Sequence, residues 1–316
     1  MKNVTCYGSG VIGTAWAVVF LKAGKNVTLF DISDEVLEKT KTNLTNALNF
    51  FKAENLITEE QVKDCLSRAT FTTDVKTAVE NAEFIQESAP ERLDIKKEVA
   101  ATIEEYAPAD AIICSSTSGL LISDIARDTK HKERFVGGHP YNPVYLVPLV
   151  EITKGEFASD ENVAKAKAFY TEVGKEPIVL NREVPGFVCN RIQIAVMREA
   201  YDLVDTGVVS VEDVDKAVAY SVGLRYGIIG PHLVNELGGG PGGIRSILTH
   251  IGPATKAWLE DMAKWTVIPE GYIEKAVAGV ADEMANREPG RGQSHDELQT
   301  YLNRGMIQIL KYQGKL

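Results

Sequence analysis

A histidine and a glutamate near the middle of the chain have the residue types that move a proton together. His139 follows an apolar, strand-like run and precedes a proline-rich turn, and Glu151 ends or nearly ends the next apolar run. An imidazole in such a place can take a proton from an alcohol, while a nearby carboxylate fixes its tautomer and stabilises the imidazolium. A histidine at a strand end is by itself more often structural, so the hypothesis depends on what the rest of the chain supplies.

Two further polar residues could contact the reacting oxygen of a substrate. Ser118 lies in the segment Cys114–Gly119, where its hydroxyl could equally serve a turn or cap a helix. Ser116 and Thr117 of the same segment could do similar work and rank lower. Asn190 interrupts an apolar helical stripe, and a buried amide is costly unless it is paired. Its partner could be a substrate oxygen or the backbone, and both alternatives stay open.

A glycine-rich turn near the N-terminus predicts a redox cofactor for this proton transfer. The run GSGVIG follows an apolar strand-like run and opens a helix-like run; its expected cofactor-binding residues are Gly8, Gly10, Val11, Ile12 and Gly13. The first glycine permits a tight turn, the second lets the backbone approach a pyrophosphate, and the third lets helix and strand pack closely. Free N–H groups at the helix N-terminus face the phosphates. A strand–turn–helix unit without a ligand is the less favoured alternative.

An acidic residue after the next strand-like run indicates which dinucleotide is bound. Asp31 closes the run Asn26–Phe30 and can accept hydrogen bonds from the adenosine ribose hydroxyls. It would repel a 2′-phosphate, and neither of the next two residues is Arg or Lys. The sequence therefore predicts NAD rather than NADP.

Length, charge and cysteine usage narrow the function classes. The 316 residues allow about two domains, and the net charge of −10 argues against a nucleic-acid partner or an anionic membrane surface. No apolar run approaches the length that spans a bilayer, and a strand begins too early for a signal peptide. The four cysteines have neither metal-ligand nor CxxC spacing. We therefore expect no metal site, no membrane partner and a cytoplasmic location.

The apolar periodicity predicts two domains of different class. Strands are expected at 3–7, 26–30, 83–87, 111–114, 135–139, 149–152 and 177–180, and helices at 14–23, 34–52, 59–67, 93–106 and 161–173. This alternation is typical of an α/β Rossmann fold with a doubly wound, mostly parallel sheet, which binds ligands beyond the carboxyl ends of its strands. We expect this NAD-binding domain to span residues 1–183.

The periodicity becomes helical from residue 184 onward. We expect an all-α domain over 184–316 that supplies one wall of the substrate cleft. Its first helix follows Phe187, and a capping box at Ser210 and Asp213 opens another, which Gly223 can end. Further helices are expected at 253–263, 272–286 and 294–312.

Four motifs, in order, resemble the 3-hydroxyacyl-CoA dehydrogenase superfamily. They are the glycine turn, SSTSGL at 115–120, HPYNP at 139–143 and PGFVCNR at 185–191, and the resemblance runs from about residue 3 to about residue 250. It implies that the active-site positions are Ser118, His139, Glu151 and Asn190. It also implies cofactor contacts for Glu91 and Lys96, to which we add Ser116, and a homodimer formed through the helical domain.

The chain departs from the acyl-CoA enzymes of this superfamily. Ser116 stands where they usually carry Asn, Arg225 adds a cation within 223–231, and 237–243 is unusually rich in glycine. These features resemble the free-acid branches, the L-carnitine dehydrogenases and the L-gulonate 3-dehydrogenases with their lens relative lambda-crystallin. The runs 84–94, 144–151 and 237–247 look most like those of the carnitine enzymes.

A free 3-hydroxy acid must be held by its carboxylate. The planar guanidinium of Arg225 suits a carboxylate through two parallel hydrogen bonds, although an internal salt bridge is an equally weighted alternative. A trimethylammonium group would rest on aromatic faces, for which the leading candidates are Tyr145 and Tyr226, with Tyr141, Trp258 and Trp265 also available. Aromatic residues at these spacings are more often part of a core.

The sequence thus predicts an NAD-dependent dehydrogenase that oxidises the 3-hydroxyl of a small polar 3-hydroxy acid to the 3-oxo acid. L-Carnitine, giving 3-dehydrocarnitine, is the first expected substrate and L-gulonate the second. A 3-hydroxyacyl-CoA is third, because the helical stretch 34–67 is not strongly basic. The alternative outside enzymes is a crystallin-like NAD-binding structural protein, against which the complete set of active-site positions argues.

Overall fold

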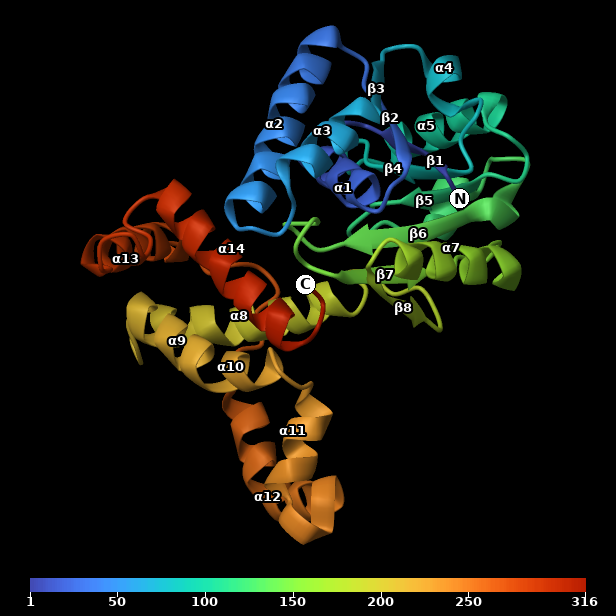
Figure 1. Cartoon of the computed structure of the whole chain (residues 1–316). Helices are drawn as coiled ribbons and strands as arrows, with labels where there is room; N and C mark the ends of the chain where they lie inside the picture. The colour runs from blue at the N-terminus through green and yellow to red at the C-terminus, as the bar shows by residue number, and fades with distance from the viewer. The chain divides into compact units, whose positions relative to one another are not determined.

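The computed structural model describes residues 1–316, which divide into two compact units, Met1–Asn190 and Arg191–Leu316. The first unit holds an eight-stranded sheet with flanking helices, and the second consists of helices (Figure 1). The predicted class, a Rossmann-like α/β domain followed by an all-α domain, is confirmed. No helix in the chain combines the length and the apolar character needed to cross a membrane.

The strand order places a ligand crevice beside the first strand. The strands are β1 Asn3–Tyr7, β2 Asn26–Phe30, β3 Ala69–Thr72, β4 Phe84–Glu87, β5 Ile112–Ser115, β6 Phe135–Pro140, β7 Leu149–Thr153 and β8 Glu176–Leu180. They lie in the order β3-β2-β1-β4-β5-β6-β7-β8, and β1 to β6 are parallel. The chain leaves β1 toward β2 on one side and returns to β4 on the other, so ligands should bind beyond the ends of β1 and β4.

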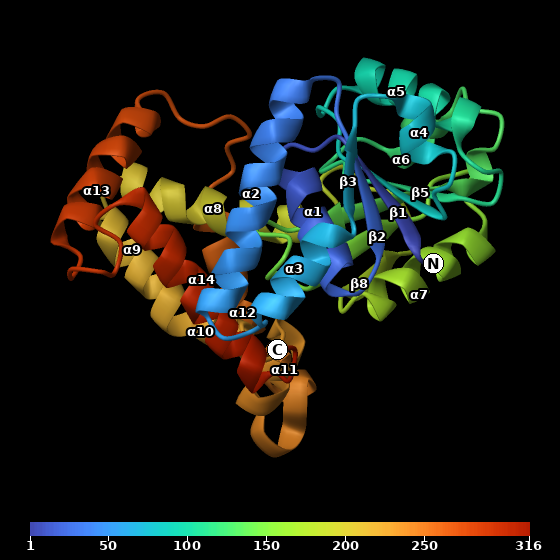
Figure 2. The same cartoon turned by 45° about the horizontal axis from the view of Figure 1, so that its top comes forward.

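Helices cover both faces of the sheet, which explains why its strands are apolar on both sides. The helices are α1 Val11–Lys22, α2 Asp34–Ala53, α3 Glu59–Ser67, α4 Val75–Val79, α5 Leu93–Tyr106, α6 Ile122–Ala126 and α7 Asp160–Glu172. On one face, Phe20 of α1 and Phe169 of α7 pack on Phe84 of β4, with 4.2 Å between the centroids of Phe84 and Phe169. The next residue, Ile85, joins the core on the opposite face together with residues of α4, α5 and α6, because side chains alternate along a strand. Figure 2 shows these three helices close to one another.

The second unit has a small core of its own. Its helices are α8 Cys189–Asp205, which begins in the first unit, α9 Val211–Ala217, α10 Gly223–Tyr226, α11 Pro231–Gly238, α12 Gly243–Asp261, α13 Tyr272–Asn286 and α14 His295–Tyr312. Val204, Val214 and Tyr272 form a buried cluster that joins α8, α9 and α13. Ser210 caps α9 by accepting the backbone N–H of Asp213 at 3.1 Å.

Two expectations about the second unit are wrong, and one helix was missed. Gly223 does not end a helix: its φ of −61° is helical, and a π-helical turn at Val218–Val222 leads directly into α10. The helix expected to begin at Pro253 begins at Gly243 and contains Pro253. The sequence also gave no prediction for α11, which starts with a proline at its first position. A proline can occupy that position because the N–H group it lacks would have no helical partner there.

Candidate active site

The structure brings His139 and Glu151 together across two antiparallel strands. The register of β6 and β7 sets the two residues directly opposite each other, and His139 Nδ1 lies 2.7 Å from Glu151 Oε2. Both side chains are buried, with exposed fractions of 6% and 0%. Because Nδ1 faces a carboxylate, it carries the proton of the neutral ring, and Nε2 is left as the proton acceptor.

Glu151 reaches this pair by a different route from the one expected. It is the third residue of β7 rather than the end of a strand, and it meets His139 because β7 runs antiparallel to β6. Its other oxygen, Oε1, accepts the backbone N–H groups of Val188 at 2.8 Å and Cys189 at 3.0 Å. Burial acts to raise the pKa of Glu151, but the hydrogen bonds from His139, Cys189 and Val188 outweigh it and lower the pKa. Glu151 is therefore a carboxylate at neutral pH.

Asn190 links three segments that are far apart in sequence. Its Nδ2 donates to the main-chain oxygen of Ser118 at 2.9 Å, and its Oδ1 accepts from the hydroxyl of Tyr141 at 2.6 Å. The ring of Tyr141 lies edge-on to that of His139, with 5.3 Å between centroids. Of the two open alternatives for this amide, the backbone partner is thus present. The tyrosine partner was not predicted, although a hydroxyl-bearing ring within HPYNP was visible in the sequence.

Glu91 holds the backbone of the serine segment. Its Oε1 accepts the N–H of Ser118 at 2.7 Å, the N–H of Gly119 at 3.2 Å and the hydroxyl of Thr117 at 2.7 Å. The side chain of Glu91 is 43% exposed, whereas Thr117 is buried. Ser118 itself is exposed. Glu91 therefore fixes the backbone of the loop that carries Ser118, while the side chain of Ser118 remains accessible.

Lys96 lies inside the protein. It is 1% exposed, and its Nζ contacts Glu87 at 2.9 and 3.1 Å, the main-chain oxygen of Ala89 at 3.0 Å and Glu91 at 3.6 Å. An ammonium group has three hydrogens to donate, and protein acceptors surround all of them. A direct contact between Lys96 and a cofactor would require the release of one of these partners.

Ser116 belongs to a polar network at the ends of β4 and β5. Its hydroxyl accepts from Gln86 Nε2 at 2.8 Å and lies 2.9 Å from the hydroxyl of Ser88. Gln86 is fully buried, and its Oε1 accepts from Tyr170 at 2.7 Å. Because β4 borders the crevice where the strand order reverses, this network holds the strand ends beside the expected ligand site in place.

Packing within the fold explains two glycines of the turn, Gly8 and Gly13, but does not explain Gly10. Gly8 has a φ of +92°, and a Cβ there would lie 2.8 Å from the main-chain oxygen of Ser88. A Cβ at Gly13 would lie 1.8 Å from the main-chain oxygen of Gly8. A Cβ at Gly10 would meet no atom within 4 Å. Packing therefore demands the first and third glycines, and the open space at Gly10 fits a phosphate group that approaches the backbone.

Asp31 lies beside this turn at the end of β2. Its Oδ2 accepts the backbone N–H of Ser9 at 2.8 Å, and its Oδ1 accepts that of Ile32 at 2.9 Å. The N–H groups of Val11 and Ile12 open α1, where a helix has no internal acceptors for them. The turn thus presents donors for phosphates and an acid for ribose hydroxyls, as a dinucleotide requires.

The expected substrate contacts divide between the two units. In the first unit, Tyr145 is half-buried and packs edge-on against Phe51 of α2, with 5.7 Å between ring centroids. In the second unit, Arg225 is exposed, and the exposed fractions of Tyr226 and Trp258 are 45% and 60%. The indole nitrogen of Trp265 donates to a carboxylate of α8 at 3.0 Å, which is a structural role.

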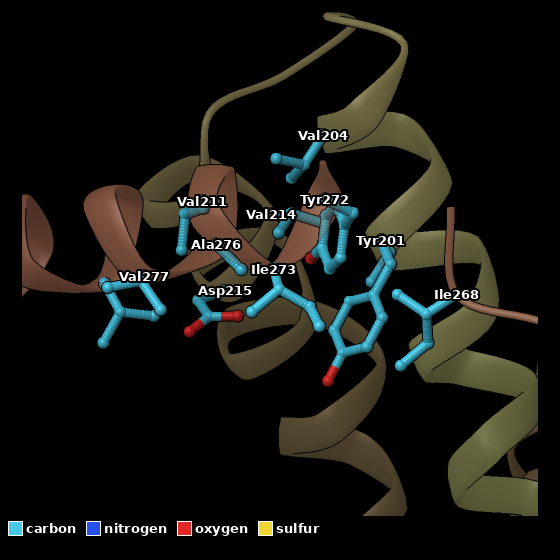
Figure 3. Close-up of a pocket in the computed structure, with 12 residues that line it drawn as sticks. Tyr201, Val204, Val211, Val214, Asp215, Ile268, Tyr272, Ile273, Ala276 and Val277 are labelled. Atoms are coloured by element: carbon cyan, nitrogen blue, oxygen red, sulfur yellow. The ribbon is translucent and has the colours of Figure 1, made fainter. Parts of the chain in front are cut away.

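The helical unit has an apolar pocket of about 390 Å³ between α8, α9 and α13 (Figure 3). Tyr201 and Tyr272 stack in its wall, with 4.8 Å between ring centroids. Asp215 is the single charged residue that lines it, among valine, isoleucine and alanine side chains. With no basic group in its lining, this pocket is unsuited to hold the carboxylate of a hydroxy acid.

Both parts of the chain match models of known protein families. Residues 3–184 match "3-hydroxyacyl-CoA dehydrogenase, NAD binding domain". Residues 186–277 match "3-hydroxyacyl-CoA dehydrogenase, C-terminal domain".

Individual relatives extend the similarity over nearly the whole chain. An L-carnitine dehydrogenase from a Pseudomonas species is 37% identical over 319 residues, which cover 99% of this chain and 94% of the relative. A 3-hydroxyacyl-CoA dehydrogenase from Gibberella moniliformis is 39% identical over 267 residues, which cover 84% of this chain and 81% of the relative. Among solved structures, the NAD-dependent 5-formyl-3-hydroxy-2-methylpyridine 4-carboxylic acid 5-dehydrogenase has a TM-score of 0.80 at 25% identity, covering 99% of this chain and 97% of that one.

Proposed function

The chain belongs to the 3-hydroxyacyl-CoA dehydrogenase family, and we propose that within this family it oxidises the 3-hydroxyl of free L-carnitine to give 3-dehydrocarnitine. Family and relatives together make it an NAD-dependent 3-hydroxy acid dehydrogenase, so the proposal concerns the substrate and the residues that act on it. The geometry that carries the proposal is the buried pair of His139 and Glu151, which leaves Nε2 of the imidazole as a proton acceptor.

Each residue near the pair has a defined part in the proposed reaction. His139 takes the proton of the 3-hydroxyl at Nε2, and the Glu151 carboxylate stabilises the imidazolium that results. The hydroxyl of Ser118 and the second N–H of the Asn190 amide donate to the reacting oxygen as it becomes a carbonyl. Bound NAD supplies the acceptor for the hydride that leaves C3. Such positioning and charge stabilisation contribute several kcal/mol to lowering the barrier, on the order of 10²–10⁴ in rate for the proton transfer.

The residues of the glycine turn and its surroundings each have a proposed part in binding NAD. The open space at Gly10 and the N–H groups of Val11, Ile12 and Gly13 would hold the pyrophosphate. Asp31 accepts from the adenosine ribose. Three more residues, Ser116, Glu91 and Lys96, would hold the loops around the nicotinamide, and among them Glu91 has a partly exposed side chain.

Substrate recognition rests on charge. The exposed guanidinium of Arg225 is the proposed partner of the carboxylate, and Tyr145 and Tyr226 are the proposed neighbours of the trimethylammonium group. The name of the solved relative supports a free acid, because it denotes an enzyme that acts on a carboxylic acid rather than on a thioester. L-carnitine dehydrogenases from a Pseudomonas species and two Streptomyces species align along 91% or more of their own length, at 35–37% identity.

We also propose a homodimer formed through the helical unit. Large apolar side chains are exposed there on α8 and α13, with exposed fractions of 60% for Ile192, 58% for Ile194, 61% for Ile273 and 60% for Val277. Large apolar side chains exposed in this number are typical of a surface that another chain covers. A cytoplasmic location remains a prediction and agrees with four cysteines that form no disulfide.

The deciding experiment compares substrates under one set of conditions. NADH formation is measured with L-carnitine, D-carnitine, L-gulonate and a 3-hydroxybutyryl-CoA. The proposal expects the highest kcat/KM for L-carnitine and little turnover of its enantiomer. The thioester is the second candidate, because the Gibberella relative carries that activity in its name. Turnover of the thioester alone would overturn the free-acid proposal, and NAD binding without turnover of any substrate would favour a structural role.

A further inference from the structure

Tyr141 occupies a place in the site that the proposed reaction has not used. It follows His139 by one proline, on the loop that leaves β6. Its hydroxyl donates to Asn190 Oδ1 at 2.6 Å, and its ring stands edge-on to the His139 ring at a 66° interplanar angle. One side chain therefore touches both the imidazole and the amide of the proposed site.

The direction of these hydrogen bonds follows from chemistry. The main-chain oxygen of Ser118 can only accept, so the atom of Asn190 that lies 2.9 Å from it must be the NH₂ group. The amide oxygen then faces Tyr141. Because Oδ1 carries no hydrogen, the Tyr141 hydroxyl must be the donor. The chain of bonds from Tyr141 through Asn190 to Ser118 has one possible polarity.

The environment of Tyr141 keeps this donor in place. Desolvation by burial, with smaller electrostatic contributions from Cys189 and Glu151, raises the pKa of Tyr141 to about 12. The hydroxyl therefore keeps its proton over the whole pH range in which a dehydrogenase is assayed. A phenylalanine at this position would keep the ring beside His139 and lose the donor.

An amide held at both ends presents a fixed face. With one N–H on Ser118 and Oδ1 on Tyr141, the second N–H of Asn190 keeps a constant direction, and a donor rather than an acceptor is offered beside the loop of Ser118. A preorganised donor stabilises a developing carbonyl or alkoxide oxygen without the cost of reorientation during the reaction. An amide free to rotate would spend part of its time offering its oxygen.

We propose that Tyr141 is a positioning residue that locks the Asn190 amide with its free N–H available to the reacting oxygen of the substrate. This inference rests on the proposed function in one respect, that Asn190 contacts the substrate oxygen. The lock itself is a property of the protein without substrate, so it can be measured separately from turnover.

Kinetics of Tyr141→Phe give the first test. The variant should lose about tenfold in kcat with L-carnitine, the size expected for one hydrogen bond that matters in the transition state, while KM for NAD changes less than about twofold. If Tyr141 acts through Asn190, the same substitution should cause no further loss in an Asn190→Ala background. The matched control is Tyr106→Phe, which removes an exposed hydroxyl on α5 and should leave kcat unchanged.

Magnetic resonance of the side-chain NH₂ group gives a test that needs no turnover. In protein with isotope-labelled asparagine, the Asn190 signal is assigned by its disappearance in Asn190→Ala. It should be sharp in the wild type and in Tyr106→Phe, and should shift and broaden in Tyr141→Phe as the amide starts to rotate. An unchanged Asn190 signal in Tyr141→Phe overturns the inference, as does a full kcat or a tenfold loss that persists without Asn190. Wild-type protein that turns over none of the substrates overturns the proposed function, and the NH₂ signal still decides the lock.

Discussion

Glu151→Gln should switch the tautomer of His139 and thereby remove the proton acceptor. Oε1 of Glu151 accepts two backbone N–H groups, from Val188 and Cys189. A glutamine must keep its oxygen on those donors, so its NH₂ group turns toward His139 Nδ1. That nitrogen must then accept, and the ring proton moves to Nε2, the atom that has to be free in the proposed reaction.

The size of the effect has two parts. Loss of the charge-assisted hydrogen bond that His139 donates to this buried carboxylate at 2.7 Å removes about 1.5–3 kcal/mol, which is about 10- to 150-fold in rate. The wrong tautomer adds to this, as in serine-protease triads whose acid is replaced by an amide, where kcat falls by about 10⁴. We therefore expect kcat with L-carnitine to fall at least about a thousandfold.

Steady-state NADH formation with L-carnitine measures this loss, and fluorescence titration of NAD checks that cofactor binding is retained. Glu105→Gln, an exposed change on α5 of the same chemical kind, is the matched control and should keep full kcat. The reasoning is refuted if Glu151→Gln retains more than about a tenth of wild-type kcat while still binding NAD.

Four further outcomes follow from individual residues. His139→Ala should lower kcat at least about a hundredfold with NAD affinity retained, because it removes the proposed base. Gly10→Ala should weaken NAD binding at least about tenfold and shift Tm by less than about 2 °C, because its methyl group would meet no protein atom. Gly13→Ala should unfold the protein, because its methyl group would lie 1.8 Å from a backbone oxygen. Lys175 is buried, and desolvation, with Lys22 adding to the effect, lowers its pKa to about 7. Between pH 7 and about 10.5 the unfolded chain therefore binds a proton that the folded chain does not, and the free energy of unfolding should rise with pH across that window. Denaturant titrations should show that Lys175→Met removes this rise. Arg225→Ala should raise KM for L-carnitine about tenfold and leave KM for NAD unchanged.

Each of these outcomes has a clear opposite. Near-normal turnover by His139→Ala rules out His139 as the base. Equal effects of the two glycine changes on stability would mean that the open space at Gly10 is not reserved for a ligand. Parallel stability–pH curves for the wild type and Lys175→Met would show that this lysine does not titrate on unfolding. An unchanged KM for L-carnitine in Arg225→Ala would remove Arg225 from the substrate site.

Elements with a regular apolar pattern and clear end signals could be predicted from the sequence. The bounds expected for β1, β2, α3 and α5 agree with the structure, because each has a clear period and clear end signals. The sequence analysis did not predict β3, α4 or α6, which have four or five residues each. The strands β1 and β2 are equally short but belong to the glycine-turn motif, whose flanking strands can be predicted, whereas tertiary packing decides the conformation of these three elements.

The site divides in the same way. The residue types and their order in the sequence suggested that His139 and Glu151 could meet. They meet because β6 and β7 pair antiparallel, and an alternating βα pattern does not predict that pairing. The partner of Asn190 depends on where the chain brings Tyr141 and Ser118, and nothing local to any of the three encodes it. Lys96 is likewise buried because its ammonium group pairs with Glu87 at the end of β4, and the sequence around Lys96 does not predict that partner.

A crystal structure of the complex with NAD and L-carnitine tests the central claim most directly. The account predicts that the 3-oxygen of carnitine lies within hydrogen-bond distance of His139 Nε2, about 2.6–3.2 Å, while Nδ1 stays on Glu151. A bound carnitine whose 3-oxygen lies beyond about 5 Å from Nε2, with another side chain in contact with it, would contradict the account.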